Sequence, residues 1–154
     1  GTPGEIRIQS PTVFLEYWGN AEATEASFSD GWFCTGDIAV IEDDYYRIMG
    51  RSSVDITKSG GYKLSALEIE NKLLAHPQIA AVAVVGIADR TWGEAVAAVV
   101  ALKGDGDMTL DALKSWCDGK LSSYKVPKQL QVVDALPRNA MGKVVKPALK
   151  PLFE

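Results

Sequence analysis

Residues 79–102 read IAAVAVVGIADRTWGEAVAAVVAL, two apolar runs on either side of a short polar break. Runs of small and β-branched residues that are bounded by turn residues indicate β-strands. We therefore expect two neighbouring strands, over 79–89 and 94–103, joined by the break between them. The longest apolar run, over 79–88, is too short to span a bilayer, so no membrane span is expected.

The segments on either side of these strands carry helix signals. Ser65 followed by Glu68 forms a capping box, and Thr109 is a good N-cap for a second helix. A short third strand is expected within 129–136, and Pro147 is well placed in the first turn of a final helical segment. The order helix, two strands, helix, strand, helix predicts an α+β fold, in which helices cover a small three-stranded sheet.

The first 50 residues follow a different plan. Apolar and polar residues alternate over 5–9, and two short β-runs surround Asp43 and Asp44, which predicts a hairpin. A short helix is expected over 20–28. This β-rich stretch does not repeat the order of the later elements. We therefore expect it to be the tail of a larger N-terminal domain, joined to the rest through 50–61.

The composition is that of an ordinary folded protein. The 154 residues are 47% hydrophobic and 23% charged, and the net charge of −4 with a pI near 5.1 argues against nucleic-acid binding. Cys34, Cys117 and His76 cannot form a zinc cluster at any usual spacing and are expected to be structural. The first residues show no signal-peptide layout and lack methionine. We therefore expect the true N-terminus to lie elsewhere, in a cytoplasmic or organelle-matrix protein.

Lys143 lies in the segment PRNAMGKVVK, residues 137–146. A Walker-type phosphate loop needs glycine six positions before the lysine and serine or threonine after it, whereas this chain has Pro137 and Val144. Two interpretations remain. Lys143 is either an exposed lysine in a loop, or a cation beside a glycine that reaches the developing charge of a phosphate.

Three other segments allow both a structural and a functional interpretation. Gly60 and Gly61 form either a hairpin turn or a narrow wall for an extended ligand. Asp37 forms either an Asx-turn or an acceptor for the two hydroxyls of a ribose. Arg51 either binds a phosphate or ribose or pairs with a nearby acid. Trp92 is expected to be a packing residue beside a turn.

Taken together, four segments of the chain resemble the AMP-forming acyl-CoA synthetases in order and spacing. This is the adenylate-forming superfamily that also contains luciferases and peptide-synthetase adenylation domains. The third and fourth segments are most similar to the malonyl-CoA synthetase branch. The four segments are GEIRIQSPTVFLEYWG (4–19), DGWFCTGD (30–37), GRSSVDITKSGGYKLSALEIE (50–70) and PRNAMGK (137–143).

The resemblance covers essentially the whole chain and implies a division into domains. Residues 1–51 resemble the end of a large N-terminal adenylation domain, 52–55 a hinge, and 56–154 a small C-terminal lid domain. The family's phosphate loop and acid pocket are not among these residues. The chain has one residue more than many relatives before Asp55, so the hinge is placed only within 52–55.

The resemblance also implies roles for single residues. Asp37 would hold the ribose of ATP or AMP, and Arg51 would contact the nucleotide beside the hinge. Lys143 would be the catalytic lysine of adenylation. Gly60 and Gly61 would line the tunnel for the pantetheine arm of coenzyme A. The implied substrates are ATP, coenzyme A and a carboxylic acid, with Mg²⁺ bound mainly by the rest of the enzyme.

Two other functions stay open at this point. If the chain is part of such a ligase, we expect it to be inactive alone. The first alternative is a non-catalytic stand-alone module. A third interpretation is an adenylation domain that loads a carrier protein. It is less favoured because the chain stops at Glu154, soon after the lysine motif.

Overall fold

The computed structural model describes all 154 residues, which form two compact units. Unit 1 is Gly1–Ser53 and unit 2 is Val54–Glu154. The division falls inside the stretch 52–55, where the hinge is expected. That these residues act as a hinge stays a prediction.

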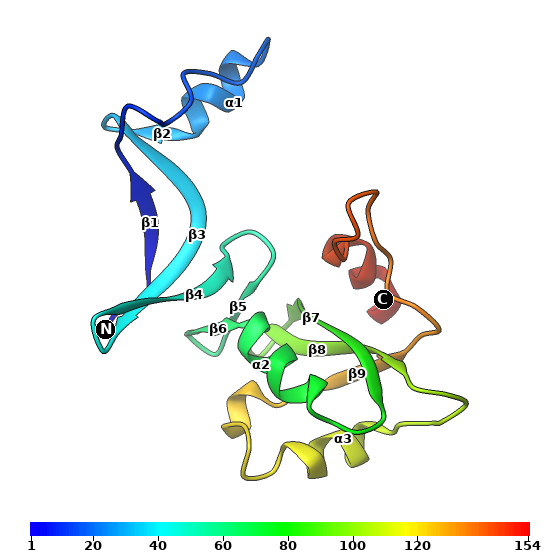
Figure 1. Cartoon of the computed structure of the whole chain (residues 1–154). Coiled ribbons are helices and arrows are strands. Elements are labelled where there is room, and N and C mark those ends of the chain that lie inside the picture. Colours follow the sequence, from blue (N-terminus) through cyan, green and yellow to red (C-terminus); the bar gives the residue numbers. More distant parts are fainter. The chain divides into compact units, whose positions relative to one another are not determined.

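Unit 1 is a four-stranded antiparallel sheet built around its longest strand, β3 (Figure 1). The predicted hairpin is confirmed, because β3 and β4 pair in register on either side of Asp43 and Asp44. The predicted short helix forms as α1, and its N-cap Asn20 accepts a hydrogen bond from the N–H of Ala23 at 3.0 Å. The elements are β1 (Gly4–Ile8), α1 (Ala21–Ala26), β2 (Phe28–Ser29), β3 (Trp32–Glu42) and β4 (Tyr45–Arg51).

Unit 2 contains a five-stranded sheet in the order β6-β5-β8-β7, with β9 parallel to β8. The α+β class is confirmed, but the sheet is larger than the three strands expected from the sequence. The hairpin of β5 and β6 supplies the two further strands. The elements are β5 (Ile56–Ser59), β6 (Tyr62–Ser65), α2 (Ala66–Leu74), β7 (Ile79–Asp89), β8 (Gly93–Leu102), α3 (Leu110–Cys117), η1 (Ser123–Lys125), β9 (Gln129–Val132) and η2 (Lys146–Phe153).

The core of unit 2 lies on both faces of the β7–β8 hairpin. Alternate residues of β8 point to opposite faces, and both sets are almost completely buried. Burial on both faces explains why these strands read as continuous apolar runs instead of alternating ones. One face packs against α2 and α3 through Ile69, Leu73, Val84, Val96, Ala98, Val100 and Leu113. The other packs against the C-terminal segment through Ala83, Val85, Ala97, Val99, Leu136 and Leu149.

Both predicted helix caps of unit 2 are present. The hydroxyl of Ser65 accepts from the N–H of Glu68 at 3.2 Å, and the hydroxyl of Thr109 accepts from the N–H of Ala112 at 3.2 Å. The C-terminal segment forms the 3₁₀ helix η2, with Pro147 in its first turn as expected. No helix of the chain has the length and apolar character needed to cross a membrane.

Candidate functional site

Asp37 and Arg51 face each other across the β3–β4 ladder. They are Cα partners in the register, and the Nε of Arg51 lies 3.1 Å from Oδ1 of Asp37. Asp37 lies inside β3, so the Asx-turn interpretation is excluded. The alternative in which Arg51 pairs with a nearby acid is observed. Because their side chains are 36% and 62% exposed, both groups also remain within reach of a polar ligand.

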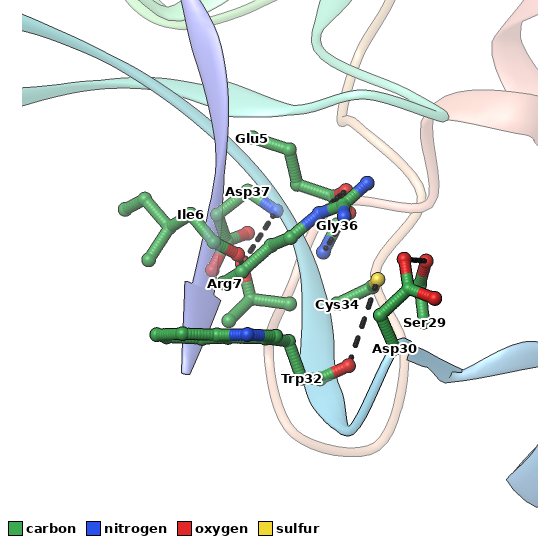
Figure 2. Close-up of polar contacts among 10 residues, drawn as sticks. Glu5, Ile6, Arg7, Ser29, Asp30, Trp32, Cys34, Gly36 and Asp37 are labelled. Atoms are coloured by element: carbon green, nitrogen blue, oxygen red, sulfur yellow. Dashed lines mark hydrogen bonds and ion pairs between the residues drawn. The ribbon is translucent and has the colours of Figure 1, made fainter. Parts of the chain in front are cut away.

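The backbone beside Asp37 is held by strand β1. Gly36 has a φ of 74°, and its N–H donates to the carboxylate of Glu5 at 3.0 Å. The hydroxyl of Thr35 donates to the carbonyl of Ile6 at 2.8 Å and accepts from the N–H of Asp37 at 3.1 Å. Figure 2 shows Glu5 and Ile6 lying against Gly36 and Asp37. The position of Asp37 is therefore fixed by contacts with a second strand.

The Gly60–Gly61 pair forms the two-residue turn between β5 and β6, which confirms the hairpin interpretation. Their φ values are 56° and 83°. A Cβ on Gly60 would lie 2.9 Å from Cε3 of Trp92, and the N–H of Gly60 donates to the carbonyl of Trp92 at 2.9 Å. A Cβ on Gly61 would meet nothing within 4 Å. Trp92 is thus a packing residue beside this turn, as expected, and Gly61 borders open space.

Lys143 is exposed at the base of a tight hairpin loop that follows β9. The side-chain oxygen of Asn139 accepts from the N–H groups of Met141 and Lys143, each at 3.0 Å. The N–H of Asn139 donates to the carbonyl of Lys143, and the N–H of Gly142 donates to the carbonyl of Asn139, both at 2.9 Å. The loop backbone is therefore held in one shape, while the lysine side chain extends into solvent. The Gly60–Gly61 turn belongs to another loop of unit 2.

Sequence reasoning missed a part-buried ion triad in unit 2. Nζ of Lys146 lies 2.5 Å from Oδ1 of Asp55 and 2.7 Å from Oε1 of Glu70. The three side chains are only 11%, 13% and 15% exposed, in the order Lys146, Asp55 and Glu70. Oε1 of Glu70 also accepts from the N–H of Val84 at 2.8 Å. Lys146 and Asp55 are 91 positions apart, so no local pattern could have paired them.

His76 and Cys117 of unit 2 lie among packed side chains. The His76 ring packs against Trp116 at 4.7 Å between ring centroids, and burial, assisted by the nearby Lys120, lowers the pKa of His76. Burial raises the pKa of the Cys117 thiol despite the opposing charge of Lys120. A buried thiol with a raised pKa is a poor nucleophile. The chain contains no group of three or more His, Cys, Asp or Glu side chains that could hold a metal ion.

A family model described as the AMP-binding enzyme C-terminal domain matches residues 68–143, a segment that begins in α2 and ends at Lys143. Residues 68–143 of the chain thus belong to this domain family.

Several relatives that match nearly the whole chain are CoA ligases. The malonate–CoA ligase ACSF3, mitochondrial, of Mus musculus is 54% identical over 147 residues, which are 95% of this chain and 25% of that protein. The malonate–CoA ligase of Arabidopsis thaliana is 50% identical, over 98% of this chain and 27% of that protein. The crystal structure of ATP-bound MatB from Rhodopseudomonas palustris matches with a TM-score of 0.87 and 36% identity, over 99% of this chain and 31% of MatB. The chain thus spans about a quarter of the length of the curated relatives it matches.

Proposed function

We propose that the chain is the C-terminal portion of an AMP-forming acid–CoA ligase. The whole enzyme would activate a carboxylic acid with ATP to an acyl-adenylate and then transfer the acyl group to coenzyme A. The observation that supports this best is the identity of 50% or more to two malonate–CoA ligases over nearly the whole chain. We further propose malonate as the acid, and an organelle matrix as the compartment, since the mouse relative is named mitochondrial.

In unit 1, Asp37 and Arg51 would bind the nucleotide. A carboxylate accepts hydrogen bonds from both hydroxyls of a ribose, and a guanidinium donates to phosphate or ribose oxygens. The ion pair at 3.1 Å between the two side chains holds each in a defined orientation before the ligand arrives. Their partial exposure leaves both able to contact ATP or AMP.

In the first half-reaction, Lys143 would act on the reacting groups. The carboxylate oxygen of the acid attacks the α-phosphorus of ATP, a new O–P bond forms, and the bond to pyrophosphate breaks. Two negatively charged groups approach each other in this step. An ammonium group between them offsets that repulsion, an effect that typically lowers the barrier by about 3 kcal/mol. Lys143 suits this role because its side chain is exposed on a loop whose backbone is held by Asn139.

In the second half-reaction, the Gly60–Gly61 turn would replace Lys143 near the reacting carbon. The thiol of coenzyme A, losing its proton, attacks the acyl carbon, and AMP leaves. The two reactions need different groups at one centre, which a rotation of unit 2 about residues 52–55 would provide. Gly61 supports this role, because the open space beside it would admit a pantetheine arm.

Magnesium is the usual counter-ion of pyrophosphate in such a reaction. Among the His, Cys, Asp and Glu side chains of this chain, no group of three or more could hold a metal ion on its own. We therefore propose that any Mg²⁺ is held by the remainder of the enzyme, together with the substrates.

The role of Lys143 is tested by Lys143→Ala in the full-length enzyme. We expect acid- and ATP-dependent pyrophosphate release to fall about 100-fold or more, because one charge contact in the transition state is lost. Lys103→Ala, which removes another exposed lysine from unit 2, is the matched control and should keep the wild-type rate. Wild-type pyrophosphate release by a normally expressed Lys143→Ala enzyme contradicts the proposed role.

Activity assays of the wild-type full-length enzyme distinguish between the remaining functions. We expect it to release pyrophosphate with malonate and ATP, and to form a thioester when coenzyme A is added. Thioester formation with another acid but not with malonate would contradict only the choice of acid. If no acid supports pyrophosphate release, the ligase function itself is wrong and a non-catalytic module is favoured.

A further inference from the structure

The part-buried triad of Lys146, Asp55 and Glu70 joins parts of unit 2 that are distant in the sequence. Asp55 is the second residue of unit 2 and the last residue of the expected hinge, 52–55. Its backbone carbonyl accepts from the N–H of Ala66, the first residue of α2, at 2.7 Å. Glu70 lies on α2 and accepts from Val84 of β7. Lys146 therefore ties the C-terminal segment to the beginning of the unit and to its central sheet.

Lys146 also lies at the base of the loop that carries Lys143. The N–H of Val145 donates to the carbonyl of Pro137 at 2.9 Å, and Arg138 pairs with Val144 in a short antiparallel bridge. These contacts close the loop on itself. The ammonium of Lys146 comes immediately after them and connects the closed loop to Asp55.

The segment η2 depends on side chains for its placement. It is a 3₁₀ helix that contains Pro147 and Pro151, and proline supplies no backbone donor. Leu149 is buried against the sheet, which sets how deeply the segment packs but gives little directional control. The ion pairs of Lys146 are directional, and in some proteins such shielded ion pairs contribute more to a unique arrangement than to stability.

We propose that Lys146 is a positioning residue for Lys143. Its ion pair with Asp55 makes the Lys143 loop and the hinge-proximal end of unit 2 move as one rigid piece, so that rotation at the hinge brings Lys143 to a defined place. The inference rests on the proposed function, in which Lys143 serves adenylation only. It predicts that losing the triad slows adenylation and spares the thioester step.

The test compares the two half-reactions in the full-length enzyme. Lys146→Met keeps the length of the side chain and removes the charge. We expect pyrophosphate release to fall roughly 10- to 100-fold, the size of effect that a misplacement of about 1 Å produces. Thioester formation from preformed acyl-adenylate and coenzyme A should stay within about threefold of wild type, because that step does not use Lys143. Equal losses in both half-reactions, or no loss in either, overturn the proposal.

Asp55→Asn provides a milder second variant, should Lys146→Met fail to fold. It should slow pyrophosphate release selectively, and the double variant should be no slower than the slower single one, since the two residues act as a unit. Additive losses would contradict this coupling. The control is Lys125→Met, which removes another α2 ion pair, from Nζ of Lys125 to Glu68 at 2.5 Å, and should cause no selective loss.

Hydrogen exchange gives a readout that does not depend on catalysis. In Lys146→Met we expect faster exchange of the Lys143 and Val145 amides. The amides of β7 and β8 should be unchanged apart from that of Val84, which donates to Glu70 of the triad. Unchanged exchange in the loop overturns the proposal even if activity falls. If Lys143→Ala keeps full activity, the proposed function fails, and the exchange data still decide whether Lys146 holds the loop.

Discussion

Two hairpin turns of this chain have the same backbone form and different residues. Asp43 and Asp44 join β3 to β4 in unit 1 with φ values of 48° and 64°. Gly60 and Gly61 join β5 to β6 in unit 2 with φ values of 56° and 83°. Positive φ at both central residues matches the right-handed twist of the paired strands.

The comparison shows that glycine is not required for the turn itself. Aspartate tolerates positive φ better than most residues, and the exposed turn at Asp43 and Asp44 uses that tolerance. Gly60 meets a second demand, because the ring of Trp92 occupies the space where a Cβ would lie. Gly61 faces open space, so packing does not explain it. The backbone of Gly61 is therefore open, as its proposed role beside coenzyme A requires.

The largest effect is expected for Gly60→Ala. The substitution combines the strain of positive φ, about 1–2 kcal/mol, with overpacking against Trp92, about 1–3 kcal/mol. Because Trp92 is half exposed and can partly move away, we expect the opening free energy of the β5–β6 hairpin to fall by about 2–3 kcal/mol. Amide exchange in β5 and β6 of the full-length protein measures this change.

Trp92→Ala separates the two contributions to the Gly60→Ala effect. With the ring removed, Gly60→Ala should lower the opening free energy of the β5–β6 hairpin only by its backbone strain. That loss should be about the same as for Gly61→Ala. Should the cost of Gly60→Ala be the same with and without the Trp92 ring, the close contact does not explain why glycine occurs here.

A smaller stability effect is expected at Gly61, with a larger effect on the reaction. Gly61→Ala should lower the opening free energy of the hairpin by about 1 kcal/mol, and Gly61→Asn by less, since asparagine tolerates positive φ. Both should slow thioester formation if the turn lines the path of coenzyme A, because each places a side chain in the open space. A Gly61→Asn enzyme with wild-type thioester kinetics would exclude the ligand-wall interpretation.

Much of the fold could be predicted because its signals are local. The caps at Ser65 and Thr109, the turn at Asp43 and Asp44, and the two apolar runs each depend on neighbouring residues. The sequence predicts the β5–β6 hairpin only as a possible turn. Its place in the sheet depends on the pairing of β5 with β8, which no local pattern shows. The burial of β7 and β8 on both faces likewise depends on the distant C-terminal segment.

The candidate site likewise contains features that local sequence predicts and features that it does not. The predicted hairpin brings Asp37 and Arg51 together, because the turn sets the register of the two strands. The resemblance to a family supplied the roles of these residues and of Lys143, which remain proposals. The triad around Lys146 could not be predicted, because an ion pair across 91 positions is created by the tertiary fold alone.

The smallest effect is expected for Asp44→Gly, which turns one hairpin toward the composition of the other. Glycine removes the strain of a φ of 64° but adds freedom to the unfolded chain, so the two contributions nearly cancel. We expect amide exchange to report a β3–β4 hairpin more stable by about 0.5 kcal/mol or less, since Asp-Gly is a preferred pair in this turn. Asp44→Ala should instead lower the opening free energy of the β3–β4 hairpin by about 1 kcal/mol. Alanine has neither the polar side chain of aspartate nor the backbone freedom of glycine. If Asp44→Ala left the opening free energy of the β3–β4 hairpin unchanged, strain at positive φ would be negligible. The loss of hairpin stability in Gly61→Ala would then need a cause other than the backbone.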